Sequence, residues 1–328
     1  MSILGLLLCF IGAIFIGPIP IPLDAWQESA ILWDIRVPRA LLGILVGASL
    51  GLAGAIAQAF FRNPLADPAL LGVSSGAALA VALSIVTQAW LEMMLSDYFE
   101  VSAIHNWRSY VIPLTAFLGA LSSCYILLFI SRKISFASVA NLLLCGIAFN
   151  AFSSALLGVC IYLSDDEQLR DFMFWTLGSV ASADQQSLFW VGGVLIGVVA
   201  LIYPLYQSIN ALSLGENIAQ HLGINLKKLQ ARMIICIALL CGVSVACCGM
   251  IGFISLVAPQ MVRMVVGSDQ RYVLIFSMFL GGLLLLVADT LARTVALPAE
   301  MPVGIFTSLI GAPYFLYLLK KRVAALYE

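Results

Sequence analysis

The segment Arg36-Val37-Pro38-Arg39 holds two arginines at the start of the second apolar run, where they are candidates for binding an anion. Proline suits the first turn of a helix, so both guanidinium groups should lie near a helix end. Arginines at a membrane boundary commonly reach lipid phosphate while their apolar stems stay buried. A carboxylate on a docking protein is the alternative, because the guanidinium fork pairs with carboxylates through two hydrogen bonds. The residues alone favour lipid and leave both partners open.

Asp289 and Arg293 lie four residues apart in a later apolar run and could form a pair on one helix face. Ionisable side chains inside a membrane point to function, but these two lie close enough to its boundary for a structural pair. His105 and His221 lack the spacing of metal ligands. The sequence offers no nucleophile with a base and no metal motif, so an enzyme is disfavoured. The eight cysteines lie inside apolar runs and are expected to be small buried hydrophobic residues.

The stretch from Leu212 to Gly223 contains a short candidate helix. Leu214, Ile218 and Leu222 recur every four residues and would form an apolar stripe. Two glycines, Gly215 and Gly223, bracket this segment, and an acidic side chain at its start suits a helix N-terminus. The pattern fits an amphipathic turn on the membrane surface as well as a knob that fits a groove on a motor subunit.

The elements that must position these residues are apolar helices. Hydrophobic residues make up 62% of the 328 residues and charged ones 10%, more apolar surface than a soluble domain can bury. Continuous apolar runs favour helices over a barrel. We therefore predict an all-α polytopic membrane protein with about ten transmembrane helices. The spans are expected at 3–17, 38–61, 69–90, 110–131, 140–163, 188–206, 230–249, 254–267, 272–294 and 304–320. The first is interpreted as a transmembrane helix, because it lacks the basic start and cleavage site of a signal peptide.

Charge fixes the expected orientation. With both termini in the cytoplasm, most of the 16 Lys and Arg residues fall on the inner side, as the positive-inside rule requires. Acidic residues gather in the predicted outer loops, at 92–100 and 165–171. The sequence has no P-loop, so ATP use would require another chain.

Small residues predict close packing of the helices. Two faces of small side chains would let neighbouring backbones approach; they consist of Gly43, Gly47, Gly51 and Gly54, and of Gly72, Gly76 and Ala80. Between them, the prolines of Asn63-Pro64-Leu65-Ala66-Asp67-Pro68 prevent a continuous helix. This break is either a segment buried in protein within the membrane or a tight cytoplasmic turn.

Taken in order, these motifs resemble those of the FecCD-type permeases, the type II ABC importers that take up siderophores, haem and cobalamin. The similarity covers essentially the whole chain. It is carried by Arg36-Val-Pro-Arg39, Gly54 to Gln58, Asn63 to Pro68, Leu71 to Gly76, Leu214 to Gly223, Gly249 to Pro259 and Pro298 to Pro313. Gln260 departs from the histidine of many relatives.

The resemblance implies one transmembrane permease domain over residues 1–328 with the type II importer fold. Its partners would be a second copy, two ATP-binding cassette subunits, a periplasmic or lipoprotein substrate-binding protein and membrane lipid, with no nucleic acid. ATP and Mg would be bound by the partner ATPase, and this chain would hold no cofactor or metal. The expected place is the bacterial inner membrane.

The resemblance also implies roles for particular residues. Arg36, Arg39 and Arg293 would dock the binding protein through its glutamates. The coupling helix to the ATPase would comprise Leu214, Gly215, Glu216, Ile218, Ala219, Leu222 and Gly223. Ser138, Val139 and Ala140 would form a cytoplasmic gate.

The substrate class rests on one segment. Ser164 to Trp175 contains a D-D-x-Q-L-R…F-W pattern that looks most like the haem-type members, with ferric siderophores next and cobalamin the alternative. A secondary transporter driven by an ion gradient is the rival from another class. Such proteins place acids or histidines in mid-membrane, where only Asp289 comes near here.

Overall fold

The computed structural model describes residues 3–17, 29–95, 101–133, 139–295 and 299–327. Every regular element in these ranges is a helix. The long or apolar helices are α1 (Ile3–Phe15), α2 (Val37–Phe61), α3 (Val73–Leu95), α4 (Val101–Lys133), α5 (Val139–Leu163), α7 (Gln185–Ile202), α10 (Leu226–Cys248), α11 (Ile254–Val266), α12 (Gln270–Val295) and α13 (Val303–Tyr327). The short elements are η2 (Ile31–Arg36), η3 (Pro68–Leu71), α6 (Asp166–Leu177), η4 (Tyr203–Leu205), α8 (Tyr206–Leu214) and α9 (Glu216–His221).

Each predicted span coincides with one of these helices. Six described segments are long and apolar enough to cross a bilayer: 31–61, 110–130, 141–163, 185–214, 226–248 and 270–295. Shorter apolar helices cover 73–88, 254–266 and 303–317. The prediction of an all-α polytopic membrane protein is therefore confirmed.

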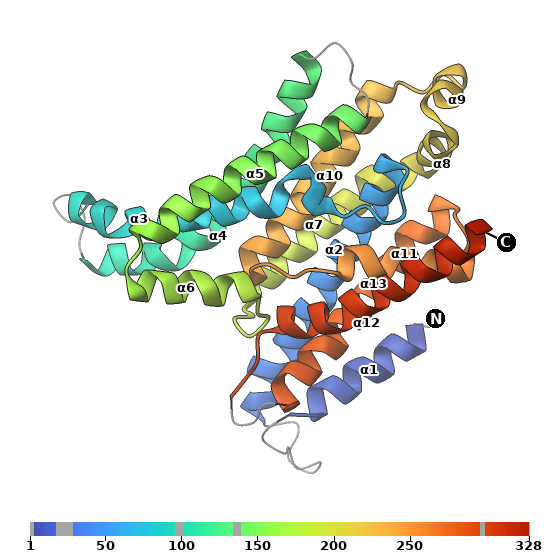
Figure 1. The fold of residues 1–328 in the computed structure, drawn as a ribbon. Coiled ribbons are helices and arrows are strands. Elements are labelled where there is room, and N and C mark those ends of the chain that lie inside the picture. The colour runs from blue at the N-terminus through green and yellow to red at the C-terminus, as the bar shows by residue number, and fades with distance from the viewer. Residues whose placement is uncertain (1–2, 18–28, 96–100, 134–138, 296–298, 328) are drawn as a thin grey trace.

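Helix α2 lies at the centre of the molecule and contacts α7, α10, α11 and α12 (Figure 1). Its partner α12 approaches so closely that a side chain on Gly47 would collide with the carbonyl of Gly281. The Gly51 position faces the carbonyl of Ser277 in the same way. We call the contact at Gly47, Gly51 and Gly281 the glycine seam. Its existence confirms the predicted small face, except that Gly43 has open space beside it.

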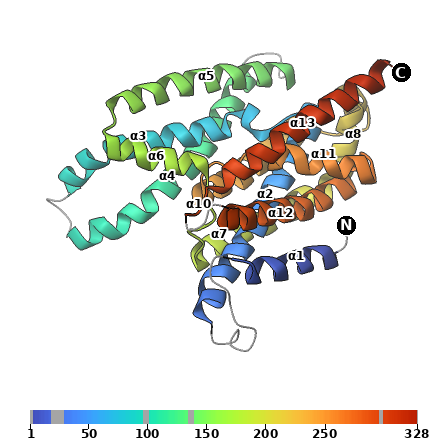
Figure 2. The ribbon, with the colours of Figure 1, turned by 60° about the horizontal axis from the view of Figure 1, so that its bottom comes forward.

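Helices α3, α4, α5 and α6 form a second group on one side of α2 (Figures 1 and 2). Within it, Gly76 of α3 and Gly119 of α4 each face the other's carbonyl group, so the second predicted face of small residues is confirmed as well. Helix α6 was not predicted. It is polar and short, and a reciprocal capping box between Asp165 and Gln168 begins it.

The proline-rich break starts as an exposed turn and continues as a segment buried in protein. Arg62 and Asn63 are exposed, whereas Pro68 and Leu71 of η3 are buried. Asn150 of α5 donates to the carbonyl of Ala69 at 3.2 Å, in addition to the 2.9 Å bond that this oxygen accepts from the N–H of Gly72. The break is thus an exposed turn followed by a segment buried in protein, and the side of the membrane on which the turn lies stays a prediction.

Candidate functional site

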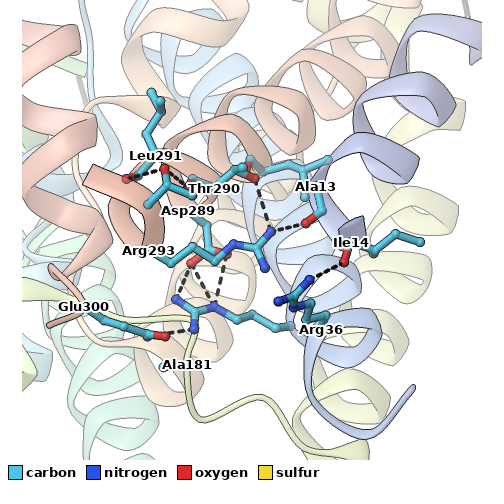
Figure 3. A network of polar contacts seen from close by, with 12 residues as sticks. Ala13, Ile14, Arg36, Ala181, Asp289, Thr290, Leu291, Arg293 and Glu300 are labelled. Carbon is cyan, nitrogen blue, oxygen red and sulfur yellow. Dashed lines mark hydrogen bonds and ion pairs between the residues drawn. The ribbon is translucent and has the colours of Figure 1, made fainter. Parts of the chain in front are cut away.

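Arg39 of α2 is held by two carboxylates. Its Nε and Nη2 donate to Asp289 of α12 at 2.8 to 3.1 Å, and its Nη1 donates to Glu300 at 2.8 Å (Figure 3). Asp289 is buried beside α2, whereas the Glu300 side chain is 45% exposed. Because the two carboxylates bind different edges of the planar guanidinium, they fix its orientation. Arg39 therefore ties the N-terminal part of α2 to α12.

Arg36 and Arg293 reach the end of α1 from two sides (Figure 3). Nη1 of Arg36 donates to the carbonyls of Ile14 and Phe15, both at 3.2 Å. Nη2 of Arg293 donates to the carbonyl of Ala13. The last carbonyls of a helix have no partner within it, so guanidinium donors complete them. We call Arg36, Arg39, Arg293, Asp289 and Glu300 the arginine cluster.

The side chains predicted to dock a partner are therefore brought together, but inside the protein. Arg36, Arg39 and Arg293 are only 4%, 7% and 3% exposed. The sequence suggested lipid phosphate or a carboxylate of a docking protein as the partner. The partners seen in the structure are carboxylates and backbone carbonyls of the same chain.

The predicted pair of Asp289 and Arg293 is the weaker of the contacts that Asp289 makes. Nε of Arg293 lies 3.9 Å from Asp289 Oδ2, outside hydrogen-bond distance. Arg39 holds the same carboxylate at 2.8 Å. The spacing of four residues thus gave the correct neighbour but not the principal partner, which lies 250 residues away in the chain.

The short helix predicted in this segment is present as α9, directly after α8, while its role in coupling stays a prediction. Gly215 and Gly223 bracket it with φ angles of +130° and +80°, a region that favours glycine. Leu214, Ile218 and Leu222 are 68%, 46% and 64% exposed, so the stripe faces outward. We call these three residues the apolar stripe.

Both short helices are attached to the ends of the long ones. Glu216 of α9 pairs with Arg62, the residue that ends α2, at 3.1 Å. Asn210 of α8 donates to Asp269 at 2.8 Å and accepts the N–H of Gln270 at 2.9 Å, at the start of α12. The Asn210 amide and the N–H of Arg271 hold the pKa of Asp269 below its ordinary value.

A cavity of about 1020 Å³ lies among α2, η3, α3, α6, α10, α11 and α13. Its lining is chiefly apolar, with Leu50, Phe253 and Leu309 as examples. Asp67 is the acid on its wall; this carboxylate accepts from Ser255 at 2.6 Å and from the N–H of Ala69 at 2.8 Å. The volume is at the upper end of ordinary small-molecule sites, which span roughly 300–1,000 Å³.

The structure describes only part of the predicted gate. Ser138 lies outside the described residues, and Val139 and Ala140 form the first turn of α5, where the side chains are not described. Their role stays a prediction. Among the residues that the structure does describe, no group of three His, Cys, Asp or Glu side chains is arranged to hold a metal ion.

Three kinds of contact were missed by reasoning from the sequence. All of them join residues that are far apart in the chain. They are the contacts of Arg39 with Asp289 and Glu300, of Arg62 with Glu216, and of Asn210 with Asp269. Opposite charges at membrane boundaries were a visible signal, but the sequence does not say which of them meet.

Comparisons with known proteins agree across the length of the chain. The family model of the FecCD transport family matches residues 4–321. The hemin transport system permease protein HmuU of Yersinia pestis is 43% identical over 292 residues, which cover 89% of this chain and 84% of that protein. The vitamin B12 import system permease protein BtuC of Vibrio cholerae is 36% identical over 307 residues, 92% of this chain and 86% of BtuC. A solved metal-chelate type ABC transporter, in an inward-facing conformation, superposes with a TM-score of 0.81 at 30% identity, covering 97% of this chain and 98% of the other.

Proposed function

The chain belongs to the FecCD transport family of ABC importer permeases, and we propose that it forms the membrane pathway of an importer for an iron chelate, with haem as the favoured cargo. The observation that carries this proposal is the match of the family model over residues 4–321 together with the 43% identity to a hemin permease. ATP would be hydrolysed by a partner subunit, and the cargo would cross without chemical change.

Haem is favoured over cobalamin for two reasons. The hemin permease is 43% identical to this chain, against 36% for the vitamin B12 permease named above. In addition, the haem-type pattern of Ser164 to Trp175 forms most of α6, and the two residues that follow the pattern on this helix, Thr176 and Leu177, line the cavity. The pattern therefore lies next to the cavity wall, where it could influence which cargo passes. Ferric siderophores are the next candidates and cobalamin is the alternative.

The cavity suits a bulky cargo that must be released again. Its wall is mostly apolar, so a large chelate would meet few strong contacts that could hold it. Exposed apolar side chains on α5, including Leu144, Ile147 and Phe152, need either lipid or protein beside them. A second copy of the chain would cover part of this surface, and the pathway would then run between the two copies.

Both termini are proposed to lie in the cytoplasm. In both views the ends of the chain lie at the same end of the molecule as α8 (Figures 1 and 2). The distribution of Lys and Arg supports placing that end on the inner side. The arginine cluster would then face the outside, and α9 would face the ATPase.

The arginine cluster is proposed to dock the substrate-binding protein by exchange of carboxylates. Glu300 is the exposed member of the cluster and holds Arg39 through one nitrogen. An acidic side chain of the binding protein could replace Glu300 on Arg39 without breaking the buried pair with Asp289. Glu300→Gln should therefore strengthen docking, and Arg39→Gln should weaken it. Unchanged affinity of the binding protein for both variants would contradict this role.

The apolar stripe is proposed to seat α9 in the ATPase. Replacement of its three residues by serine should leave ATP hydrolysis intact while uptake is lost. Asn217→Ser, an exposed position on the same helix but outside the stripe, is the matched control. Full uptake by the stripe variant would rule out this contact.

The decisive experiment for the function is uptake into proteoliposomes that contain the permease, its cognate ATPase and its binding protein. Haem, a ferric siderophore and cobalamin are offered in parallel, with and without ATP and vanadate. We expect haem uptake that requires ATP and stops with vanadate. Uptake driven by an ion gradient in the absence of ATPase would refute the proposal in favour of a secondary transporter, and preference for cobalamin would correct the substrate.

A further inference from the structure

Helix α8 lies in the angle between the ends of α2 and α12, and it contacts both helices. Its Ile209 and Leu212 side chains are fully buried there. Because such buried side chains are packed as tightly as an organic crystal, α8 cannot be displaced without moving the helices that enclose it. Its C-terminal end leads through Gly215 directly into α9.

Two polar contacts fix this arrangement on either side. On the α12 side, the Asn210 side chain makes two hydrogen bonds to the start of the helix. Its NH2 group donates to Asp269 at 2.8 Å, and its oxygen accepts the N–H of Gln270 at 2.9 Å. On the α2 side, Arg62 ends the helix in the left-handed region with φ of +51° and pairs with Glu216 at 3.1 Å. A non-glycine residue in that region is uncommon, so the backbone turn that aims Arg62 at α9 is maintained by its surroundings.

The two long helices, α2 and α12, also contact each other at two places along their length. At mid-length the glycine seam brings their backbones so close together that a side chain would not fit between them. Near the opposite end, Arg39 and Asp289 join them through three hydrogen bonds. From Arg39 to Arg62, α2 spans roughly 35 Å at the rise of an α-helix.

We propose that α8 acts as a wedge that carries the displacement of α9 into the α2–α12 pair, with Arg62 and Asn210 as the positioning residues of this connection. The pair then moves as one body and delivers the motion to the arginine cluster at its far end. This inference rests on the proposed function and adds the route of coupling within the chain. Since coupling between two sites is reciprocal, a partner that binds at the arginine cluster would alter the affinity of the ATPase for α9 through the same pair.

The connection can be weakened without unfolding the protein. The Arg62–Glu216 pair is partly exposed, with side chains 37% and 25% accessible, and exposed ion pairs add little to stability. Asp269 is likewise at the surface. Variants at these positions should therefore change the efficiency of coupling while the amount of folded complex stays the same.

The test uses the full complex in proteoliposomes and measures haem taken up per ATP hydrolysed, together with the stimulation of ATP hydrolysis by the binding protein. Arg62→Glu should lower both quantities by about fivefold or more, and the exchange of charges in Arg62→Glu/Glu216→Arg should restore them. Asn210→Ala should lower them independently, because it acts on the α12 side. Lys227→Glu, a charge reversal at an exposed position at the start of α10, is the matched control and should leave both unchanged.

Equal values for the wild type, Arg62→Glu and Asn210→Ala would overturn the wedge while leaving the importer function standing. Failure of the charge exchange to restore coupling would remove Arg62 from the route. If the wild-type complex itself shows no ATP-dependent uptake, the proposed function fails and the wedge with it. The three results are distinguishable because the wild type is measured in every series.

Discussion

The charge of Asp289 should be a main determinant of stability, and Asp289→Asn tests this with little change of shape. The buried carboxylate neutralises Arg39 through three hydrogen bonds and lies 3.9 Å from Arg293. Asparagine keeps the size and one acceptor oxygen but removes the negative charge. Two guanidinium groups, each less than 10% exposed, would then share a site whose remaining carboxylate is at the surface.

The expected loss is large for a single substitution. Removal of one partner from a buried ion pair typically costs about 3–5 kcal/mol, because the other charge stays buried and uncompensated. On the scaling of large soluble domains, this corresponds to a melting temperature roughly 6–20 °C lower. Glu300→Gln removes a charge from the same cluster, but at a side chain that is 45% exposed. Water screens that position, so at most about 1 kcal/mol is expected.

The assay is thermal unfolding of the purified permease in detergent, followed by size-exclusion chromatography and by fluorescence of its six tryptophans. The double variant Arg39→Met/Asp289→Leu supplies a second comparison, since replacement of a buried pair by apolar residues of similar volume is often neutral. It should recover part of the stability lost in Asp289→Asn. The reasoning is refuted if Asp289→Asn melts with the wild type, or if Glu300→Gln is the more damaging of the two single changes.

Three further outcomes follow from the packing, the surface charges and the helix caps. Gly281→Val should destabilise the protein by at least about 1–3 kcal/mol because the glycine seam has no room for a side chain, while Gly43→Ala, in open space, should be neutral in the same melting assay. The depressed pKa of Asp269 means that its contribution to stability is present above the unfolded pKa of about 4 and is lost as the pH falls through the lower folded value. The difference in melting temperature between wild type and Asn210→Ala should therefore be largest near pH 7 and shrink below about pH 4; a constant difference would contradict it. Asp165→Ala removes the cap of α6, which typically costs about 1 kcal/mol, and should reduce uptake through the cavity that α6 lines, whereas unaltered uptake would separate α6 from transport.

Much of the fold could be predicted because lipid leaves few alternatives. Continuous apolar runs must become helices there, and small residues at helical spacing show which faces come close. The same spacing also included Gly43, which meets nothing. The point at which two helices cross depends on their angle and register, and one sequence does not contain that information. Helix α6 was missed because it is polar, although its Asp-x-x-Gln start was a visible capping signal.

The candidate site was predictable in its residues but not in its contacts. Arg36, Arg39 and Arg293 stood out because arginines on the outer side of the chain are few. Their partners did not, since Glu300 lies 261 residues from Arg39 and nothing local marks it. The same holds for Arg62 and Glu216, which are 154 residues apart. The cavity is the feature least predictable from sequence, because its volume is the space left by seven packed elements.

The contacts at the end of α1 have a consequence for the order of assembly during synthesis. Its final carbonyls, at Ala13, Ile14 and Phe15, are completed by Arg36 and Arg293. Helix α1 thus depends on a residue made some 280 positions later. Until α12 has been inserted, α1 can sit in the bilayer but cannot finish its attachment. A nascent chain stopped before residue 293 should hold α1 loosely, and release of the complete chain should fix it.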